Sequence, residues 1–589
     1  MAAAAMAAAA AGAAPAADAP TLLRGRGQGK PKNVLLIVVD DLRPDLGSYN
    51  ATIARTPNMD RVAATGLTFS RAYVQYALCG PSRNSFMSGR RPDTTRVWSF
   101  TDHFREADVG AEWKSLPEYF KANGMLTLGS GKLFHPTLPP DNDWPRSWSA
   151  DHGYFSPECL PEGKGGLHSP QCNHSVPPPA GVACGTPVCG VGVVCGTPAG
   201  QCPYPNGHHE CITGSDQTLC LANTSADETR FEFQMEDQRI RDSCAGNLEI
   251  AAKAAKPGGE AAKGFFIGCG FHKPHVPWIV PHEFIELFPK DLGDIPLAPN
   301  THAPANMPDV AWHYPYDVKG FHEHPFNGTC KETLSRIYRR GYAAAVSYTD
   351  YNIGVLLDKL DALGLTSSTL VAVVGDHGFH LGDHDTWAKM TNFEAAVRIP
   401  LIIRCPWKTA AAGKITGVLA EAVDLYPTLA ALAGLPAPLS QGEEVNGTNL
   451  EPVFDAPGHG PTAAALKTAA FSQLAKANLQ NPFQIGAASP PGGPARNTTE
   501  IMGYTVRVDG WRYTCWFKFD HVAIVPITTA AGIIGRELYD HRADDVLAVP
   551  GAGETVNVVA EKAHASVVAE LHAAVVGYIR LYSHSHPNR

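Results

Sequence analysis

The sequence lacks the features of several common functional classes. Its 589 residues contain no apolar run long enough to cross a bilayer, so no membrane span is predicted. The net charge is -9 and no basic stripe is present, which excludes nucleic acid as the main partner. Residues 124–132 do not form a P-loop, because Ser130 occupies the lysine position of that motif. The composition, 44% apolar and 18% charged, is typical of a soluble globular protein.

The fourteen cysteines also lack the spacing of a metal site. Eight of them lie in one stretch rich in glycine and proline, at Cys159, Cys172, Cys184, Cys189, Cys195, Cys202, Cys211 and Cys220. Their spacing is irregular and includes no C-x-x-C pair, so disulfides are favoured over zinc ligation. We therefore predict an oxidising compartment and a disulfide-rich insertion at about 151–225.

The N-terminal segment, residues 1–30, is left out of the predicted fold; its first 20 residues are almost all alanine and lack the basic start and leucine-rich core of a good signal peptide. It is interpreted as a weak signal, an organellar transit segment or a mis-set start. Glycosylation sequons indicate the secretory pathway, with a lysosome-like or extracellular destination. They lie at Asn50, Asn173, Asn223, Asn327, Asn446 and Asn497.

Apolar runs and amphipathic helices alternate over residues 31–435. The β-branched run 34–39 is typical of a strand buried on both faces of a parallel sheet. A long amphipathic helix is predicted over 334–363, and a strand follows at 369–374. This alternation predicts an α/β domain with a large mixed, mostly parallel sheet flanked by helices.

The amino-acid composition changes after residue 435. Residues 436–500 are rich in proline, glycine and alanine and are predicted to be a loop-rich linker. Two strands flanking Asp509-Gly510 give a strong hairpin signal, and a closing helix is predicted over 561–581. Residues 501–589 are thus predicted to form a smaller C-terminal α/β subdomain with an antiparallel sheet.

Acidic residues follow two of the predicted strands directly. Asp40-Asp41 comes after the first strand, and Asp376-His377 comes after the strand 369–374. Ligands of open α/β sheets bind beyond the carboxyl ends of the strands. One acidic pair alone is more often a solvated loop, but two such pairs favour a site. Carboxylates that meet there require a cation, and hard oxygen ligands suit Ca²⁺ or Mg²⁺.

Cys79 lies in the string Leu78-Cys79-Gly80-Pro81-Ser82-Arg83. A lone cysteine beside a turn is most often a small buried residue. Basic side chains follow other predicted strands or come shortly after the second acid cluster and complete a pocket for an anion, although each of them alone is most often an ordinary surface or loop residue. They are Lys132, His135, His272 and Lys389.

The order of these motifs resembles the type I sulfatases of the alkaline phosphatase superfamily, in particular the iduronate-2-sulfatase group. The motifs are Asp40-Asp41, Cys79-x-Pro81-Ser82-Arg83, Gly89-Arg90-Arg91-Pro92-Asp93-Thr94-Thr95-Arg96, Gly131-Lys132 with His135, His272-Lys273-Pro274-His275, and Asp376-His377-Gly378 with Lys389. The similarity covers most of residues 33–435 and resumes over 501–539. It departs from the family in the cysteine-rich insertion and over 436–500, which leaves the substrate open.

The resemblance implies a sulfuric ester hydrolase. In this family the formylglycine-generating enzyme converts the cysteine to formylglycine, whose hydrate attacks sulfur and forms a sulfo-enzyme intermediate. The resemblance implies one Ca²⁺ held by Asp40, Asp41, the modified Cys79, Asp376 and His377. It implies that sulfate binding and proton transfers involve Arg83, Lys132, His135, His272 and Lys389. The implied substrate is a sulfated carbohydrate, whether iduronate 2-sulfate in a glycosaminoglycan, another sulfated polysaccharide or a small sulfate ester.

Two alternatives stay open at this point. One is a phosphatase or phosphodiesterase of the same superfamily, although such enzymes generally use serine or threonine with zinc. The other is a secreted protein that binds sulfated glycans without turnover. The cysteine count adds one expectation that does not depend on either: thirteen cysteines remain besides Cys79, so at least one stays free or pairs between chains.

Overall fold

A computed structural model describes most of the chain outside the N-terminal segment and the cysteine-rich insertion. The described residues are 32–51, 53–149, 151, 154–156, 209–211, 219–222, 225–227, 234–313, 332–458, 466–477, 493–544, 547 and 553–583. The targeting interpretation of residues 1–30 and the disulfides expected over about 151–225 lie outside them. Within the described residues, no helix has the length and apolar character to cross a membrane.

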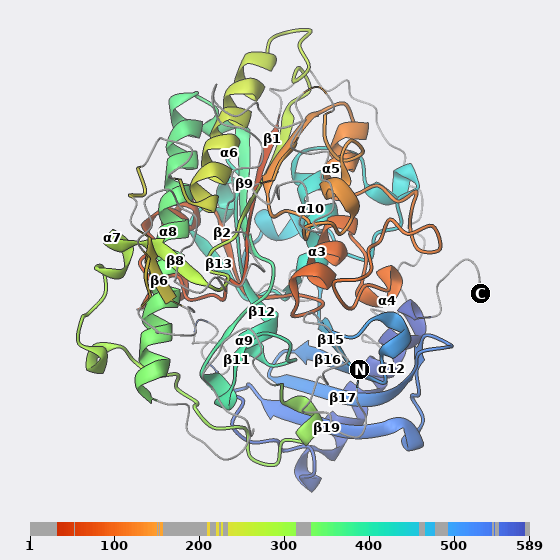
Figure 1. Ribbon diagram of the computed structural model, residues 1–589. Helices are drawn as coiled ribbons and strands as arrows, with labels where there is room; N and C mark the ends of the chain where they lie inside the picture. Colours follow the sequence, from red (N-terminus) through yellow and green to blue (C-terminus); the bar gives the residue numbers. More distant parts are fainter. Residues whose placement is uncertain are drawn as a thin grey trace, which may run out of the picture.

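A large mixed sheet forms the centre of the molecule (Figure 1). Its strand order is β13(Lys414–Thr416), β2(Leu67–Tyr73), β12(Arg398–Arg404), β9(Thr369–Gly375), β1(Asn33–Val39), β7(Phe265–Phe271), β3(Leu126–Gly131) and β4(Tyr154–Phe155). β14(Ala420–Glu421) also pairs with β2. The pairings are parallel except that β12 runs antiparallel to β2 and β9. The predicted fold class is confirmed.

Helices cover both faces of this sheet (Figure 1). Along β1, Ile37 packs in the core that includes α6(Glu236–Ala254) and α8(Glu332–Ala362). Leu36 points to the opposite core, which includes α3(Cys79–Ser88), α5(Leu116–Ala122) and α10(Leu425–Leu432). Both side chains are fully buried, and each burial contributes about 1.5–3 kcal/mol. The unbroken apolar run 34–39 follows from this two-sided burial.

Cysteine chemistry differs between positions in the described part of the chain. A disulfide joins Cys244 of α6 to Cys269 of β7 and so ties a helix to the sheet. Cys405 and Cys515 are buried and free, as is Cys79. The prediction that at least one cysteine other than Cys79 does not pair within the chain is confirmed.

The C-terminal part of the chain forms a second, antiparallel sheet below the large one in Figure 1. It contains β15(Ala470–Lys476), β16(Ile501–Val508), β17(Trp511–Asp520), β18(Val525–Pro526) and β19(Ile533–Asp540), and α12(Ala565–Tyr582) packs against it. The predicted hairpin at Asp509-Gly510 joins β16 to β17, and Gly510 has a φ of 78° that suits glycine.

Strand β15 corrects one expectation. It lies inside the stretch 436–500 that the sequence predicts to be a loop-rich linker, yet it pairs with β16 along its whole length. Its sequence, AFSQLAK, has weak polar–apolar alternation, because five consecutive residues from Ser472 to Lys476 are buried. Pairing with a distant strand, rather than a local pattern, makes this segment a strand.

Candidate active site

The carboxyl ends of β1 and β9 bring three aspartates together. Val39 and Gly375 are direct partners in the parallel pairing, so both strands end at the same level. Asp40 and Asp41 follow one strand, and Asp376 follows the other. The Asp41 N–H donates to Asp376 Oδ1 at 3.0 Å, and all three side chains are fully buried. The predicted meeting of the acids at one edge is confirmed.

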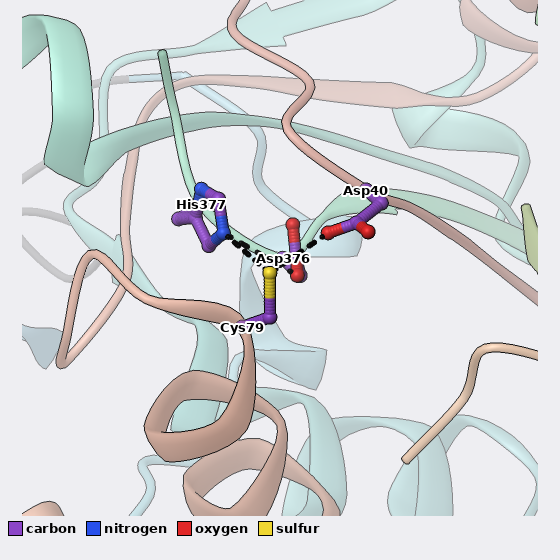
Figure 2. A group of neighbouring side chains, drawn as sticks. All are labelled: Asp40, Cys79, Asp376 and His377. Atoms are coloured by element: carbon purple, nitrogen blue, oxygen red, sulfur yellow. Dashed lines mark hydrogen bonds and ion pairs between the residues drawn. The ribbon is translucent and has the colours of Figure 1, made fainter. Parts of the chain in front are cut away.

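Cys79 is the first residue of helix α3 and points into this group of acids (Figure 2). Its Sγ lies 3.2 Å from Asp40 Oδ1 and 3.2 Å from His377 Nε2. Leu78, which precedes the helix, is extended and turns the chain into it. A helix N-terminus carries partial positive charge and unpaired N–H groups, so this position favours a bound anion.

Two lysines reach the same point from other strands. Lys132 follows β3, pairs with Asp40, and places Nζ 3.9 Å from Cys79 Sγ. Lys389 places Nζ 2.7 Å from Asp41 Oδ1 and 3.4 Å from Cys79 Sγ. Gly131 makes the turn before Lys132: its φ is 78°, and a Cβ there would lie 2.1 Å from the carbonyl oxygen of Gly270. Only glycine fits this turn.

Arg83 lies one turn after Cys79 in α3 and binds two of the acids. Its Nε donates to Asp376 Oδ2 at 2.9 Å, and its Nη2 lies 3.4 Å from Asp40 Oδ1. Its Nη1 donates to the carbonyl oxygens of Lys132 and Leu133. The side chain is fully buried. Arg83 therefore links three strand ends and neutralises part of the acidic charge.

His377 offers an unprotonated nitrogen to the group. Its Nδ1 lies 2.9 Å from the carbonyl oxygen of Gly378, which assigns the proton to Nδ1 and leaves the Nε2 lone pair facing Cys79 and, at 3.4 Å, Asp41 Oδ1. Burial and the charge of Lys389 hold the pKa of His377 well below its usual value. A neutral imidazole in this orientation is a metal ligand.

His135 follows Lys132 in the chain and stacks on an aromatic ring. Its ring centroid is 4.2 Å from that of Phe100, with an angle of 15° between the planes. Its Nδ1 lies 3.1 Å from the carbonyl oxygen of Pro136. Burial, then Lys132 and Arg83, hold the pKa of His135 well below its usual value. The imidazole is therefore neutral and can accept a proton through Nε2.

The structure places His272 and its neighbour His275 differently with respect to the acids. His272 Nε2 lies 3.3 Å from Glu236 Oε1, and its backbone N–H donates to Asp237 Oδ1 at 2.8 Å. The imidazole at ligand distance from Asp40, Asp41 and Cys79 belongs to His275. Both histidines stand in the motif His272-Lys273-Pro274-His275, but residue types alone do not show which one turns toward the acids.

The three carboxyl groups of this site differ in how readily they ionise. Burial raises the pKa of Asp376 to about 8 and that of Asp41 to about 6, and the neighbouring carboxylates add to both shifts. Burial alone would also raise the pKa of Asp40, but Lys132, His275 and Arg83 outweigh it and hold that pKa well below its usual value. Asp41 Oδ2 is buried without a hydrogen-bond partner among the described residues. A cation would relieve both the repulsion and the unpaired oxygen.

The donor set fits a hard cation. One ligand atom from each of Asp40, Cys79, Asp376 and His377 lies within 4.8 Å of the others, and the same holds for Asp40, Asp41, Cys79 and His275. Carboxylate oxygens dominate, which suits Ca²⁺ or Mg²⁺. Burial, with the charge of Asp40, raises the pKa of the Cys79 thiol well above its usual value, so the unmodified residue is a poor nucleophile.

Comparison with known proteins agrees with this geometry. The Sulfatase family model matches residues 32–136 and 204–435. The chain is 32% identical over 545 residues to iduronate 2-sulfatase of Mus musculus, covering 83% of this chain and 85% of that protein. It is 30% identical over 427 residues to a sulfatase of Formosa agariphila, covering 69% and 70% of the two chains.

Solved structures share the fold. Phosphonate monoester hydrolase SpPMH from Silicibacter pomeroyi matches with a TM-score of 0.64 and 20% identity, over 94% of this chain and 96% of that one. A protein in complex with its substrate D-glucosamine-2-N,6-O-disulfate matches with a TM-score of 0.62 and 18% identity, over 95% and 100%. By its sequence and its fold, the chain belongs to the sulfatase family of sulfuric ester hydrolases.

Proposed function

We propose that this enzyme removes sulfate from a sulfated sugar, with Cys79 converted to formylglycine and one Ca²⁺ at the strand ends. The observation that carries the proposal is the place of Cys79: it starts the buried helix α3 between Asp40, His377 and Lys389. The substrate class is supported by the likeness to iduronate 2-sulfatase and to the structure with a disulfated glucosamine.

The proposed Ca²⁺ ligands are Asp40, Asp41, Asp376, His377 and the modified residue 79. Bound Ca²⁺ supplies positive charge that polarises the sulfate oxygens and makes a coordinated hydroxyl more acidic. The raised pKa values of Asp41 and Asp376 and the unpaired Asp41 Oδ2 support a cation here. Arg83 holds the carboxylates together before and after binding.

The proposed modification explains why a cysteine occupies a position where its thiol stays protonated. Formylglycine-generating enzyme is the proposed maturation partner, and the aldehyde hydrate supplies two hydroxyls at residue 79: one accepts the sulfate group, and loss of the other's proton releases it. A serine has one hydroxyl and no such exit. Because this maturation belongs to the secretory pathway, we propose a lysosome-like or extracellular destination.

The remaining residues bind the anion and move protons. Lys132 and Lys389 flank Cys79 and face the place of the sulfate oxygens, where fixed positive groups stabilise developing negative charge. His135, neutral and stacked on Phe100, is the proposed acceptor of the second hydroxyl's proton. Lys389 or a histidine of the 272–275 motif protonates the leaving alcohol. His275 lies beside Cys79, but burial and Lys389 hold its pKa well below the usual value, which favours Lys389 as the donor.

Mass spectrometry of the peptide that contains Cys79 tests the proposal. Protein from a host with a competent secretory pathway is expected to show the aldehyde at this residue, and the peptides of the buried cysteines Cys405 and Cys515 serve as unmodified controls. An unmodified thiol at Cys79 in active protein would contradict the modification.

Comparing hydrolysis of an aryl sulfate and an aryl phosphate separates the alternatives. Preference for the sulfate is expected. Preference for the phosphate would favour the phosphatase or phosphodiesterase, and tight binding of a sulfated oligosaccharide without hydrolysis of either ester would favour the non-catalytic binding protein.

A further inference from the structure

Asp41 has an unusual backbone conformation that its surroundings hold in place. Its φ is 58°, in the left-handed region that non-glycine residues seldom adopt. Its N–H donates to Asp376 Oδ1 at 3.0 Å. Its carbonyl oxygen accepts a hydrogen bond from the Tyr342 hydroxyl at 2.8 Å. The peptide groups on both sides of this proposed Ca²⁺ ligand are therefore fixed by tertiary contacts.

The Tyr342 hydroxyl makes a second bond to the same loop. It accepts a hydrogen bond from the backbone N–H of Arg43 at 3.0 Å. One oxygen therefore makes hydrogen bonds to the residues on both sides of Leu42. Tyr342 belongs to helix α8 and is 1% exposed. In a site that excludes water, no solvent molecule replaces these two bonds when the hydroxyl is removed.

The ring of Tyr342 is also immobilised, and it touches the loop that carries the other ligands. It stacks on Phe379 with centroids 5.7 Å apart and an angle of 19°, and Trp278 meets it at 85°. Phe379 lies two residues after His377, and its carbonyl oxygen accepts a hydrogen bond from Arg43 Nη1 at 3.1 Å. Tyr342 thus contacts the ligand loops after both β1 and β9.

We propose that Tyr342 is a positioning residue that sets the orientation of Asp41 for Ca²⁺ binding. The inference rests on the proposed function, since it assumes a cation at the strand ends. Without the hydroxyl, the left-handed peptide of Asp41 loses one of its two restraints, and its carboxylate turns away from Lys389 and Asp376. Partners that orient metal ligands commonly change metal affinity although they do not touch the metal.

The test is a calcium titration of the purified, mature full-length Tyr342→Phe variant by calorimetry. This change keeps the stacked ring and removes only the oxygen. The dissociation constant for Ca²⁺ is expected to rise about 10- to 100-fold. Turnover of an aryl sulfate should recover when Ca²⁺ is raised in proportion. Tyr351→Phe is the matched control: it removes a phenol hydrogen bond to Asp227 from the same helix, and it should bind Ca²⁺ like the unsubstituted protein.

Two results would overturn the inference. In the first, the unsubstituted protein binds Ca²⁺ and Tyr342→Phe binds it within about twofold of the same affinity, whatever its melting temperature; the role of Tyr342 is then structural only. In the second, the unsubstituted protein binds no Ca²⁺, which overturns the metal part of the proposed function as well. If Tyr342→Phe does not fold, Phe379→Leu replaces it: this variant keeps the hydroxyl but loosens the ring, and an unchanged calcium affinity would again count against the inference.

Discussion

Two buried clusters of charge in this molecule use similar residues and behave in opposite ways. The strand-end cluster consists of Asp40, Asp41, Asp376, Arg83, Lys132 and Lys389. The interface cluster consists of Glu394, Arg507, Arg512, Glu554 and His541, and it joins the large sheet's domain to the C-terminal sheet. Both are almost completely buried.

The clusters differ in how far their cations offset the cost of burying the carboxylates. Glu394 accepts Arg507 Nε at 2.8 Å and Arg512 Nη2 at 2.6 Å, and Arg512 Nε lies 2.6 Å from Glu554 Oε1. Burial opposes ionisation of Glu394, but the arginines outweigh it and hold its pKa well below the usual value. At the strand ends the pKa of Asp376 is raised instead. Buried carboxylates whose cationic partners outweigh burial hold two parts of a fold together, whereas Asp41 and Asp376, whose pKa values stay raised beside their cations, indicate a site for a ligand.

The largest expected effect is at Cys79, the residue that the strand-end cluster surrounds. Cys79→Ser leaves one hydroxyl and no second one to release the sulfate group, so multiple turnover of an aryl sulfate should fall by on the order of a thousandfold or more. Intact-mass measurement should detect a sulfated enzyme or very slow turnover. Steady multiple turnover by this variant would refute the diol mechanism.

The next largest effect is expected for a variant that disrupts the strand-end cluster: it should lower the activity but not the stability of the fold. Asp376→Asn removes a proposed ligand, and kcat/KM should fall by about 100-fold or more. Because the raised pKa of about 8 leaves Asp376 largely protonated near pH 7 when Ca²⁺ is absent, a neutral amide there should change the melting temperature without Ca²⁺ little. Thermal unfolding in a chelator measures this. A large loss of stability would show that the cluster is structural after all.

Replacing a carboxylate by an amide in the interface cluster should instead lower the stability and leave the activity almost unchanged. Glu394→Gln leaves Arg507 and Arg512 buried without their shared carboxylate, and the free energy of unfolding should fall by about 3–5 kcal/mol. Activity per folded molecule should change little. Asp358→Asn is the control, because its exposed pair with Arg61 should contribute less than about 1 kcal/mol. Denaturant unfolding of the two variants tests the contrast, and equal losses would contradict it.

The smallest effect concerns pH and His541. Burial and Arg507 oppose protonation, but hydrogen bonds to Asp544 and Glu554 outweigh them and raise the pKa of His541; Glu394 adds to this. A raised folded pKa stabilises the protein fully below the unfolded value of about 6.5, and this stabilisation is lost as pH rises through the folded value.

The free energy of unfolding measured across this pH window should therefore decline as pH rises in the native protein. His541→Gln does not titrate and should show a flatter dependence. A variant whose stability declines as steeply as that of the native protein would exclude His541 as the cause.

Much of the catalytic domain follows from local sequence. The run 34–39 and the helix expected over 334–363 correspond to β1 and α8, because burial on both faces and amphipathic periodicity leave direct traces in the residue order. Strand β15 has no such pattern in its sequence. Because 24 residues lie between β15 and its partner β16, their pairing is a tertiary property. The division into domains at about residues 435 and 500 stays a prediction.

Local sequence is enough to predict which residue types meet at the site. Acids at the ends of parallel strands must share one edge of the sheet, and the motif around Cys79 identifies the family. Three contacts become visible in the folded chain alone: His275 lies beside Cys79, Arg83 binds the carboxylates, and Tyr342 donates a hydrogen bond to the backbone of Asp41. Tyr342 and Arg43 are 299 positions apart, and no local pattern records which distant side chain reaches which backbone group.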